Sequence, residues 1–223
     1  MLQKEGGPVM DILFLGDSIT DCSHNFTPDH LGEGYVKIIS QDFPEFSVTN
    51  GGSDGFTFPR TFQKWNRMYA LHPYDCAVIT GGINEAGVIM NTGLSRGQAA
   101  HFLDHSQDCL RSLLAGLLGR QTARIVLVEP FLFPVPQYRI SWLPVLEEIR
   151  SRIQKTASEF SSDTVLYLPV QDRLDGLAGS SGAAPYDAVT TDGVHLTRAG
   201  HRCLADAVSA ALCGLSLRPV RRL

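Results

Sequence analysis

Two short blocks of the sequence carry side chains that could act together in nucleophilic catalysis. Ser18 follows an apolar run in "DILFLGDSIT", and Asp192 precedes His195 by three residues in "TTDGVHLTRAGH". A carboxylate at this spacing can fix the tautomer of an imidazole and leave the other ring nitrogen free to accept a serine proton. His201 is the nearest competing histidine, and the DxxH spacing favours His195. Taken singly, Ser18 is better explained as a helix N-cap, and Asp192 and Thr197 as turn and cap residues beside a bystander histidine.

Two further blocks could supply hydrogen-bond donors for an oxyanion. The block "NGGSDGFT" has glycines at positions 51, 52 and 55, which make a turn and leave a backbone N–H uncovered, and "GGINEAG" places the side-chain amide of Asn84 after another strand. Both features are also common in turns for local reasons alone. The glycine block is similar to a dinucleotide-binding fingerprint, but Asn50 replaces the first glycine and the block follows the second strand, so we expect no nucleotide site.

The elements between these blocks predict a fold that brings them together. Short β-branched or aromatic runs alternate with longer amphipathic stretches, which is typical of βαβ units and a parallel sheet. We expect a single domain over residues 1–223, a three-layer α/β/α sandwich with a five-stranded parallel sheet. The expected strands cover residues 11–16, 46–50, 75–80, 124–130 and 164–169, and the expected helices residues 33–42, 59–70, 96–118, 142–160 and 198–214. Ligands of such sheets bind beyond the carboxyl ends of the strands, where the blocks fall.

Other motifs that could carry chemistry have simpler explanations. Ser95 lies in "GLSRG", which fits the GxSxG pattern, but no strand runs into it and Ser95 with Gln98 forms a helix capping box. His101 and His105 stand four apart on that helix without the glutamate of HExxH or a third ligand, so we expect no metal site. The Gly- and Ser-rich segment 175–187 predicts a flexible loop.

Composition excludes several classes of function. The 223 residues carry a net charge of -4 without a long run of like charge, so we expect no nucleic-acid partner. The five cysteines are odd in number and lack CxxC spacing, which indicates thiols in a reducing compartment. No apolar stretch reaches the roughly 20 residues of a membrane span, and the residues before the first predicted strand contain no apolar segment typical of a signal peptide. We therefore expect a cytoplasmic protein, with a secreted form left open because a removed signal peptide leaves no trace. Nothing in the sequence indicates an oligomeric state.

Together the four blocks resemble those of the SGNH hydrolases, also called the GDSL esterase and lipase family. The resemblance spans residues 11–201 and implies a flavodoxin-like sheet. It implies that Ser18 is the nucleophile and that Asp192 and His195 complete a catalytic triad. It also implies an oxyanion hole made of three donors, namely the backbone N–H groups of Ser18 and Gly52 and the amide of Asn84.

The resemblance implies a serine esterase that hydrolyses a small-molecule ester through an acyl-serine intermediate, without metal or cofactor. "GDSIT" in place of "GDSL" favours short-chain esters, among them acetyl groups on carbohydrates. The alternatives are a lipase or lysophospholipase, an acyltransferase with the same triad, and a catalytically silent module that binds carbohydrate or lipid. One departure concerns the third block, where Glu85 replaces the usual aspartate after Asn84, so the hydrogen bonds that orient this loop must differ.

The segment 130–142, rich in proline and aromatic residues, follows the fourth predicted strand. It either packs on the core as a loop or forms one wall of the substrate crevice. In the second case, the side chains that would contact substrate are Phe131, Phe133, Tyr138 and Trp142.

Overall fold

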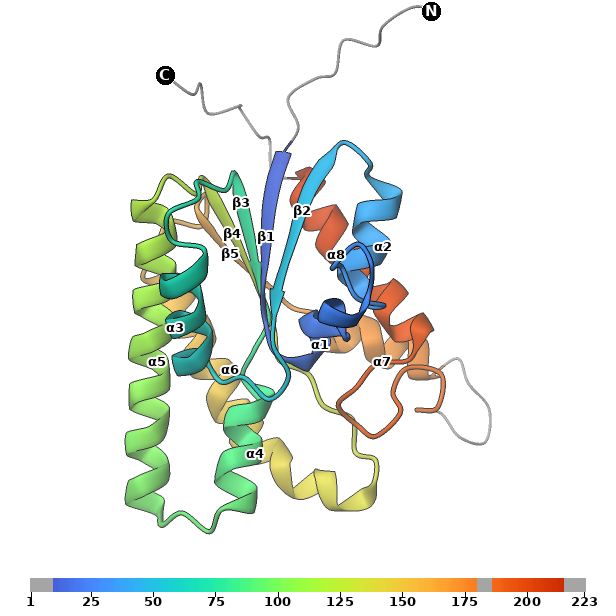
Figure 1. Ribbon diagram of the computed structural model, residues 1–223. Helices are drawn as coiled ribbons and strands as arrows, with labels where there is room; N and C mark the ends of the chain where they lie inside the picture. The colour runs from blue at the N-terminus through green and yellow to red at the C-terminus, as the bar shows by residue number, and fades with distance from the viewer. Residues whose placement is uncertain (1–9, 180–185, 215–223) are drawn as a thin grey trace, which may run out of the picture.

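A five-stranded parallel sheet forms the centre of the protein, as the sequence predicts. The computed structural model describes residues 10–179 and 186–214. The strands are β1 (Met10–Gly16), β2 (Phe46–Gly52), β3 (Cys76–Ile79), β4 (Arg124–Val128) and β5 (Val165–Leu168). Their order in the sheet is β2-β1-β3-β4-β5 (Figure 1). The chain leaves β1 toward one edge and then returns to its other side at β3, so the topological switch point lies between β1 and β3.

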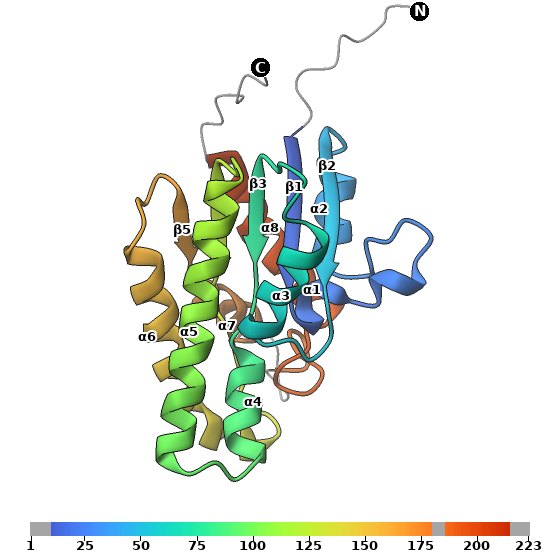
Figure 2. The same cartoon turned by 60° about the vertical axis from the view of Figure 1, so that its left-hand side comes forward.

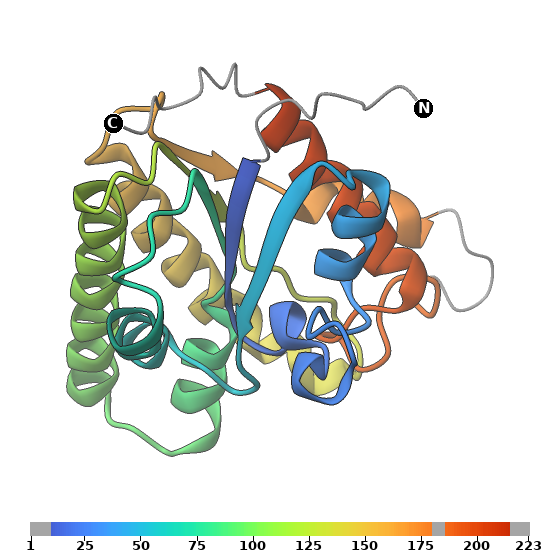
Figure 3. The ribbon, with the colours of Figure 1, turned by 45° about the horizontal axis from the view of Figure 1, so that its top comes forward.

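Helices cover both faces of the sheet, which confirms the three-layer α/β/α class (Figures 1 and 3). One face packs against α3 (Phe58–Met68), α5 (Arg96–Gly119) and α6 (Leu143–Ser158), which lie in front of the sheet in Figure 2. The other face packs against α2 (Tyr35–Asp42), α7 (Gln171–Gly179) and α8 (Arg198–Gly214). Four short elements are α1 (Ser18–Asp21), α4 (Ile83–Asn91) and the 3-10 helices η1 (His24–Phe26) and η2 (Gln137–Trp142). Among the described residues, no helix is long and apolar enough to cross a membrane.

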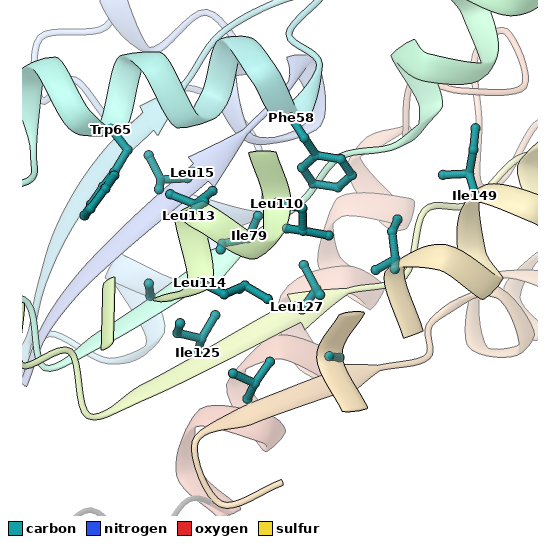
Figure 4. Packing of buried hydrophobic residues seen from close by; sticks show 14 of the residues in the cluster. Leu15, Phe58, Trp65, Ile79, Leu110, Leu113, Leu114, Ile125, Leu127 and Ile149 are labelled. Atoms are coloured by element: carbon teal, nitrogen blue, oxygen red, sulfur yellow. The ribbon is translucent and has the colours of Figure 1, made fainter. Parts of the chain in front are cut away.

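Strand β1 supplies side chains to both hydrophobic layers. Leu13 and Leu15 point into the layer under α3, α5 and α6, whereas Ile12 and Phe14 point into the layer under α2 and α8. All four are fully buried, and burial of one such side chain is worth about 1.5–3 kcal/mol. Figure 4 shows the first layer, where residues of the sheet lie beside α5; labelled examples are Leu15, Ile79, Leu110, Leu113 and Leu114. The end of β1 is therefore held rigidly from both sides.

Residues 171–179 form helix α7, so the prediction of a loop over residues 175–187 is wrong for its first part. Leu174 and Ala178 lie one turn apart and are buried against the sheet, and this apolar stripe outweighs the low helix propensity of the glycines. Residues 180–185 of the predicted loop lie outside the described residues. Helix α4 was also absent from the expected elements; it begins directly after the turn at Gly82, which has a φ of +110°.

Candidate active site

Strand β1 delivers Ser18 to the carboxyl edge of the sheet. Asp17, not Ser18, is the N-cap of α1, because its Oδ1 accepts the backbone N–H of Ile19 at 3.0 Å. Asp17 is only 1% exposed, and this burial raises the pKa of its carboxyl to about 6, against the lowering effect of the hydrogen bond from Ile19. The explanation of Ser18 as a capping residue is therefore wrong, and its hydroxyl is free for another partner.

Ser18, His195 and Asp192 form one chain of hydrogen bonds. Ser18 Oγ lies 3.0 Å from His195 Nε2, and His195 Nδ1 lies 2.7 Å from Asp192 Oδ2. The other oxygen of Asp192 accepts the backbone N–H groups of His195 at 2.8 Å and Val194 at 2.9 Å. Partial burial raises the pKa of Asp192, but the hydrogen bonds from His195 and Val194 outweigh it and hold the pKa below its ordinary value. Asp192 is thus an ionised carboxylate that orients the imidazole.

The competing histidine and the competing serine have other partners. His201 is buried in the first turn of α8, where Nδ1 accepts the backbone N–H of Tyr35 at 3.3 Å and Nε2 lies 3.4 Å from Cys22 Sγ. Burial lowers the pKa of His201 to about 4, and the nearby His195 adds to this shift. The interpretation of Ser95 as a helix cap is confirmed, because both hydrogen bonds of its capping box with Gln98 are present.

An open cavity of about 370 Å³ lies over Ser18 and His195. This volume is within the range of about 300–1,000 Å³ that is usual for small-molecule sites. Five segments line the cavity: the start of α1, the loop after β2, helix α4, helix η2 and the loop before α8. Its lining residues are Ser18, Asp54, Gly55, Ile83, Asn84, Gly87, Val88, Asn91, Thr92, Arg139, Trp142, Val194 and His195.

Two residues that carry hydrogen-bond donors line this cavity with Ser18. Asn84 lines it from the first turn of α4, and its Nδ2 donates one hydrogen bond to the carbonyl oxygen of Phe56 at 2.9 Å. A side-chain amide has two N–H groups, so one remains for a ligand. Gly55 lines the cavity with a φ of +68°, a conformation that favours glycine. Within the described part of the chain, its N–H has no hydrogen-bond acceptor.

Gly52 does not lie in this cavity, which corrects its assignment as an oxyanion donor. Its N–H already donates to Asn50 Oδ1 at 2.9 Å, and the residue is buried at the end of β2. A Cβ added at Gly52 would lie 2.3 Å from the backbone nitrogen of Asp21. The glycine is therefore needed for the close approach of β2 to α1. The residue of this block that does line the cavity is Gly55, and the Asp54-Gly55 pair, a turn dipeptide, is the sequence signal that could have marked it.

Glu85, which replaces the usual aspartate after Asn84, accepts the hydrogen bonds that orient this loop. It is 1% exposed, and its Oε1 accepts both the backbone N–H of Phe58 and the hydroxyl of Ser106, each at 2.7 Å. These bonds join the start of α4 to the start of α3 and to α5. They also hold the loop that carries Phe56, the partner of Asn84. Burial raises the pKa of Glu85 to about 7, opposed by the hydrogen bonds from Ser106 and Phe58.

We expect Glu85→Gln to change how stability depends on pH. The folded protein binds the Glu85 proton more tightly than the unfolded chain, so the free energy of unfolding falls as pH rises through the window between 4.5 and about 7. Relative to Glu85→Gln, the wild type should lose about 3 kcal/mol between pH 4.5 and 8. Urea denaturation of both proteins at the two pH values measures this difference. If the wild type and Glu85→Gln differed in free energy of unfolding by the same amount at both pH values, Glu85 would not be a buried carboxyl with a raised pKa.

The aromatic residues of segment 130–142 divide between the core and the cavity. Trp142 lines the cavity, and Tyr138 is 59% exposed outside it. Phe131 and Phe133 do not line the cavity; they are 5% and 0% exposed in the layer beneath α7 and α8. Their assignment as substrate contacts is wrong, because both rings pack into the hydrophobic layer that also holds Val128 and Leu174.

Comparisons with known proteins identify the family and agree with the fold. Residues 14–203 match the profile of the GDSL-like lipase/acylhydrolase family. A solved structure from Parabacteroides merdae, described as a GDSL-like lipase, is 26% identical, with a TM-score of 0.78 over 93% of this chain and 97% of that one. The acetylxylan esterase Axe2 from Geobacillus stearothermophilus is 24% identical, with a TM-score of 0.75 over 98% and 100% of the two chains. At this identity, the second likeness shows a shared fold.

Proposed function

Because the chain belongs to the GDSL-like lipase/acylhydrolase family and is a carboxylic ester hydrolase, we propose that it is a serine esterase that removes acetyl groups from carbohydrates. The observation that carries this proposal is the hydrogen-bonded series from Ser18 Oγ through His195 to Asp192, with Ser18 and His195 lining an open cavity.

Ser18 is the nucleophile of this reaction. Its Oγ attacks the ester carbonyl carbon as His195 Nε2 takes the hydroxyl proton, and Asp192 stabilises the imidazolium that forms. The tetrahedral intermediate then collapses: the bond to the leaving oxygen breaks, and His195 gives its proton to the departing alcohol. The acyl group remains on Ser18.

Water completes the cycle by the same proton transfers. His195 takes a proton from a water molecule that attacks the acyl-serine carbonyl, and the second tetrahedral intermediate releases the carboxylic acid. The proton returns from His195 to Ser18 Oγ, which restores the starting state.

Three donors hold the negative oxygen of each intermediate. We assign them to the backbone N–H groups of Ser18 and Gly55 and to the free N–H of the Asn84 amide. This assignment keeps two of the donors implied by the sequence and replaces Gly52, whose N–H is bonded to Asn50. The hydrogen bond from Asn84 to the Phe56 carbonyl fixes the amide plane before substrate binds, as electrostatic preorganisation requires.

The lining of the cavity supports a short acyl group and a hydroxyl-rich alcohol. Phe131 and Phe133, which could have formed a channel for a long chain, are buried in the core. Polar side chains supply about half of the lining; they are Ser18, Asp54, Asn84, Asn91, Thr92, Arg139 and His195. The fold shared with an acetylxylan esterase supports the same choice.

A series of p-nitrophenyl esters tests this function. We expect kcat/KM to fall by about tenfold or more from acetate to octanoate, because Phe131 and Phe133, which could have extended an acyl channel, are buried in the core. Acetate release from an acetylated xylooligosaccharide, followed by chromatography, tests the alcohol side. A preference for octanoate would favour a lipase, and acyl transfer to an added sugar would favour a transferase. The absence of any ester hydrolysis would favour a binding module.

A further inference from the structure

Arg139 lies in the lining of the cavity without a counterion. It belongs to η2 and is half-buried, and its Nε is buried without a hydrogen-bond partner among the residues that the structure describes. Among the described residues, no carboxylate lies within ion-pair distance of its guanidinium. Arg150, in the adjacent helix α6, differs in this respect, because it pairs with both Glu129 and Glu147.

The guanidinium of Arg139 is held in place by aromatic rings. It lies 4.0 Å from the centre of the Trp142 ring and 5.2 Å from that of Tyr138. Stacking on an aromatic face leaves the N–H groups at the edge of the guanidinium free to bind two oxygens side by side. The Trp142 ring is in turn packed against α4, where a Cβ at Gly87 would lie 3.6 Å from it. The cation is thus preorganised on a fixed platform.

Arg139 and Asp54, the arginine and the carboxylate in the cavity lining, differ in their exposure to water. Asp54 also lines the cavity, but it is exposed to water, so solvent compensates its charge. A half-buried guanidinium has lost part of its hydration. A bound anion would compensate for the lost contacts with water. A planar carboxylate matches the guanidinium through two parallel hydrogen bonds.

We propose that Arg139 binds a carboxylate on the alcohol half of the substrate, so that the preferred substrates are acetyl esters of acidic sugars or of other hydroxy acids. The inference rests on the proposed function, because an acetyl group carries no charge and the anion must therefore belong to the alcohol. Arg139 then determines specificity, whereas Ser18 and His195 carry out the ester cleavage.

A matched pair of substrates tests this inference. The probes are 4-acetoxybenzoate, which carries a carboxylate, and 4-acetoxybenzamide, which has the same shape without the charge. The quantity measured is the ratio of their kcat/KM values. We expect Arg139→Gln to lower this ratio by about tenfold or more, as the loss of a charged hydrogen-bonded pair predicts. Arg139→Lys should retain part of the preference, because a point charge replaces the two-pronged contact.

Arg67→Gln is the control, because it removes the same charge from an exposed position on α3; we expect it to leave the ratio unchanged. A ratio in Arg139→Gln equal to that of the wild type would overturn the inference, even if both rates fall, since damage to η2 lowers both together. If the wild type hydrolyses p-nitrophenyl acetate through Ser18 but the substrate ratio is the same in Arg139→Gln as in the wild type, only the inference fails. If it hydrolyses no ester, the proposed function fails with it.

Discussion

We expect Ser18→Ala to lower kcat for p-nitrophenyl acetate by about 10⁴-fold or more. Removing the hydroxyl removes the atom that becomes acylated, and only the oxyanion donors and substrate binding then remain to accelerate attack by water. Within residues 10–179 and 186–214, Ser18 Oγ hydrogen-bonds only to His195, and alanine is a good helix former in the first turn of α1. The variant should therefore fold, which circular dichroism and thermal unfolding can verify.

Ser95→Ala is the matched control for this substitution. Ser95 lies in the sequence "GLSRG" and caps α5, so its loss should cost about 1 kcal/mol of stability and leave the rate of ester hydrolysis unchanged. The opposite outcome, in which Ser95→Ala loses activity and Ser18→Ala keeps it, would show that the nucleophile is wrongly assigned. Mass spectrometry with a fluorophosphonate probe gives an independent readout, because the modified peptide should contain Ser18.

The second large effect is expected for Asp192→Asn, with a loss of about 10⁴-fold in kcat at neutral pH. In the wild type, Asp192 Oδ2 accepts the proton on His195 Nδ1, so Nε2 faces Ser18 as a proton acceptor. An amide nitrogen in that place would instead donate to Nδ1. The imidazole would then carry its proton on Nε2, and the general base would be lost.

The expected loss is electrostatic and not structural. Asp192 Oδ1 accepts two backbone N–H groups, and asparagine can keep both of these hydrogen bonds. Thermal stability should therefore change little, while kcat falls. Asp163→Asn, at an exposed position before β5, is the control and should keep the full rate. A fall of less than about tenfold in Asp192→Asn would argue that another group orients the imidazole.

Much of the fold was encoded in the local pattern of residues. The alternation of Ile12 and Phe14 with Leu13 and Leu15 predicts a strand buried on both faces, and the structure places them so. The five strands and the layers followed from similar runs. The members of the site share one edge because every parallel strand ends there, so Ser18 and Asn84 converge on the switch point between β1 and β3.

The sequence by itself identified the side chains that we assign as nucleophile, general base and orienting carboxylate, because their identification depends on residue type and short spacing, as in Asp192 and His195. Only the tertiary structure decided which backbone N–H is available, since the bond from Gly52 to Asn50 and the exposure of Gly55 both depend on how β2 meets α1. The tertiary structure also decided that Phe133 is buried in the core and does not line the cavity. It decided as well that Arg139 lines the cavity with no counterion among the described residues, because an ion pair can join residues that are far apart in the sequence.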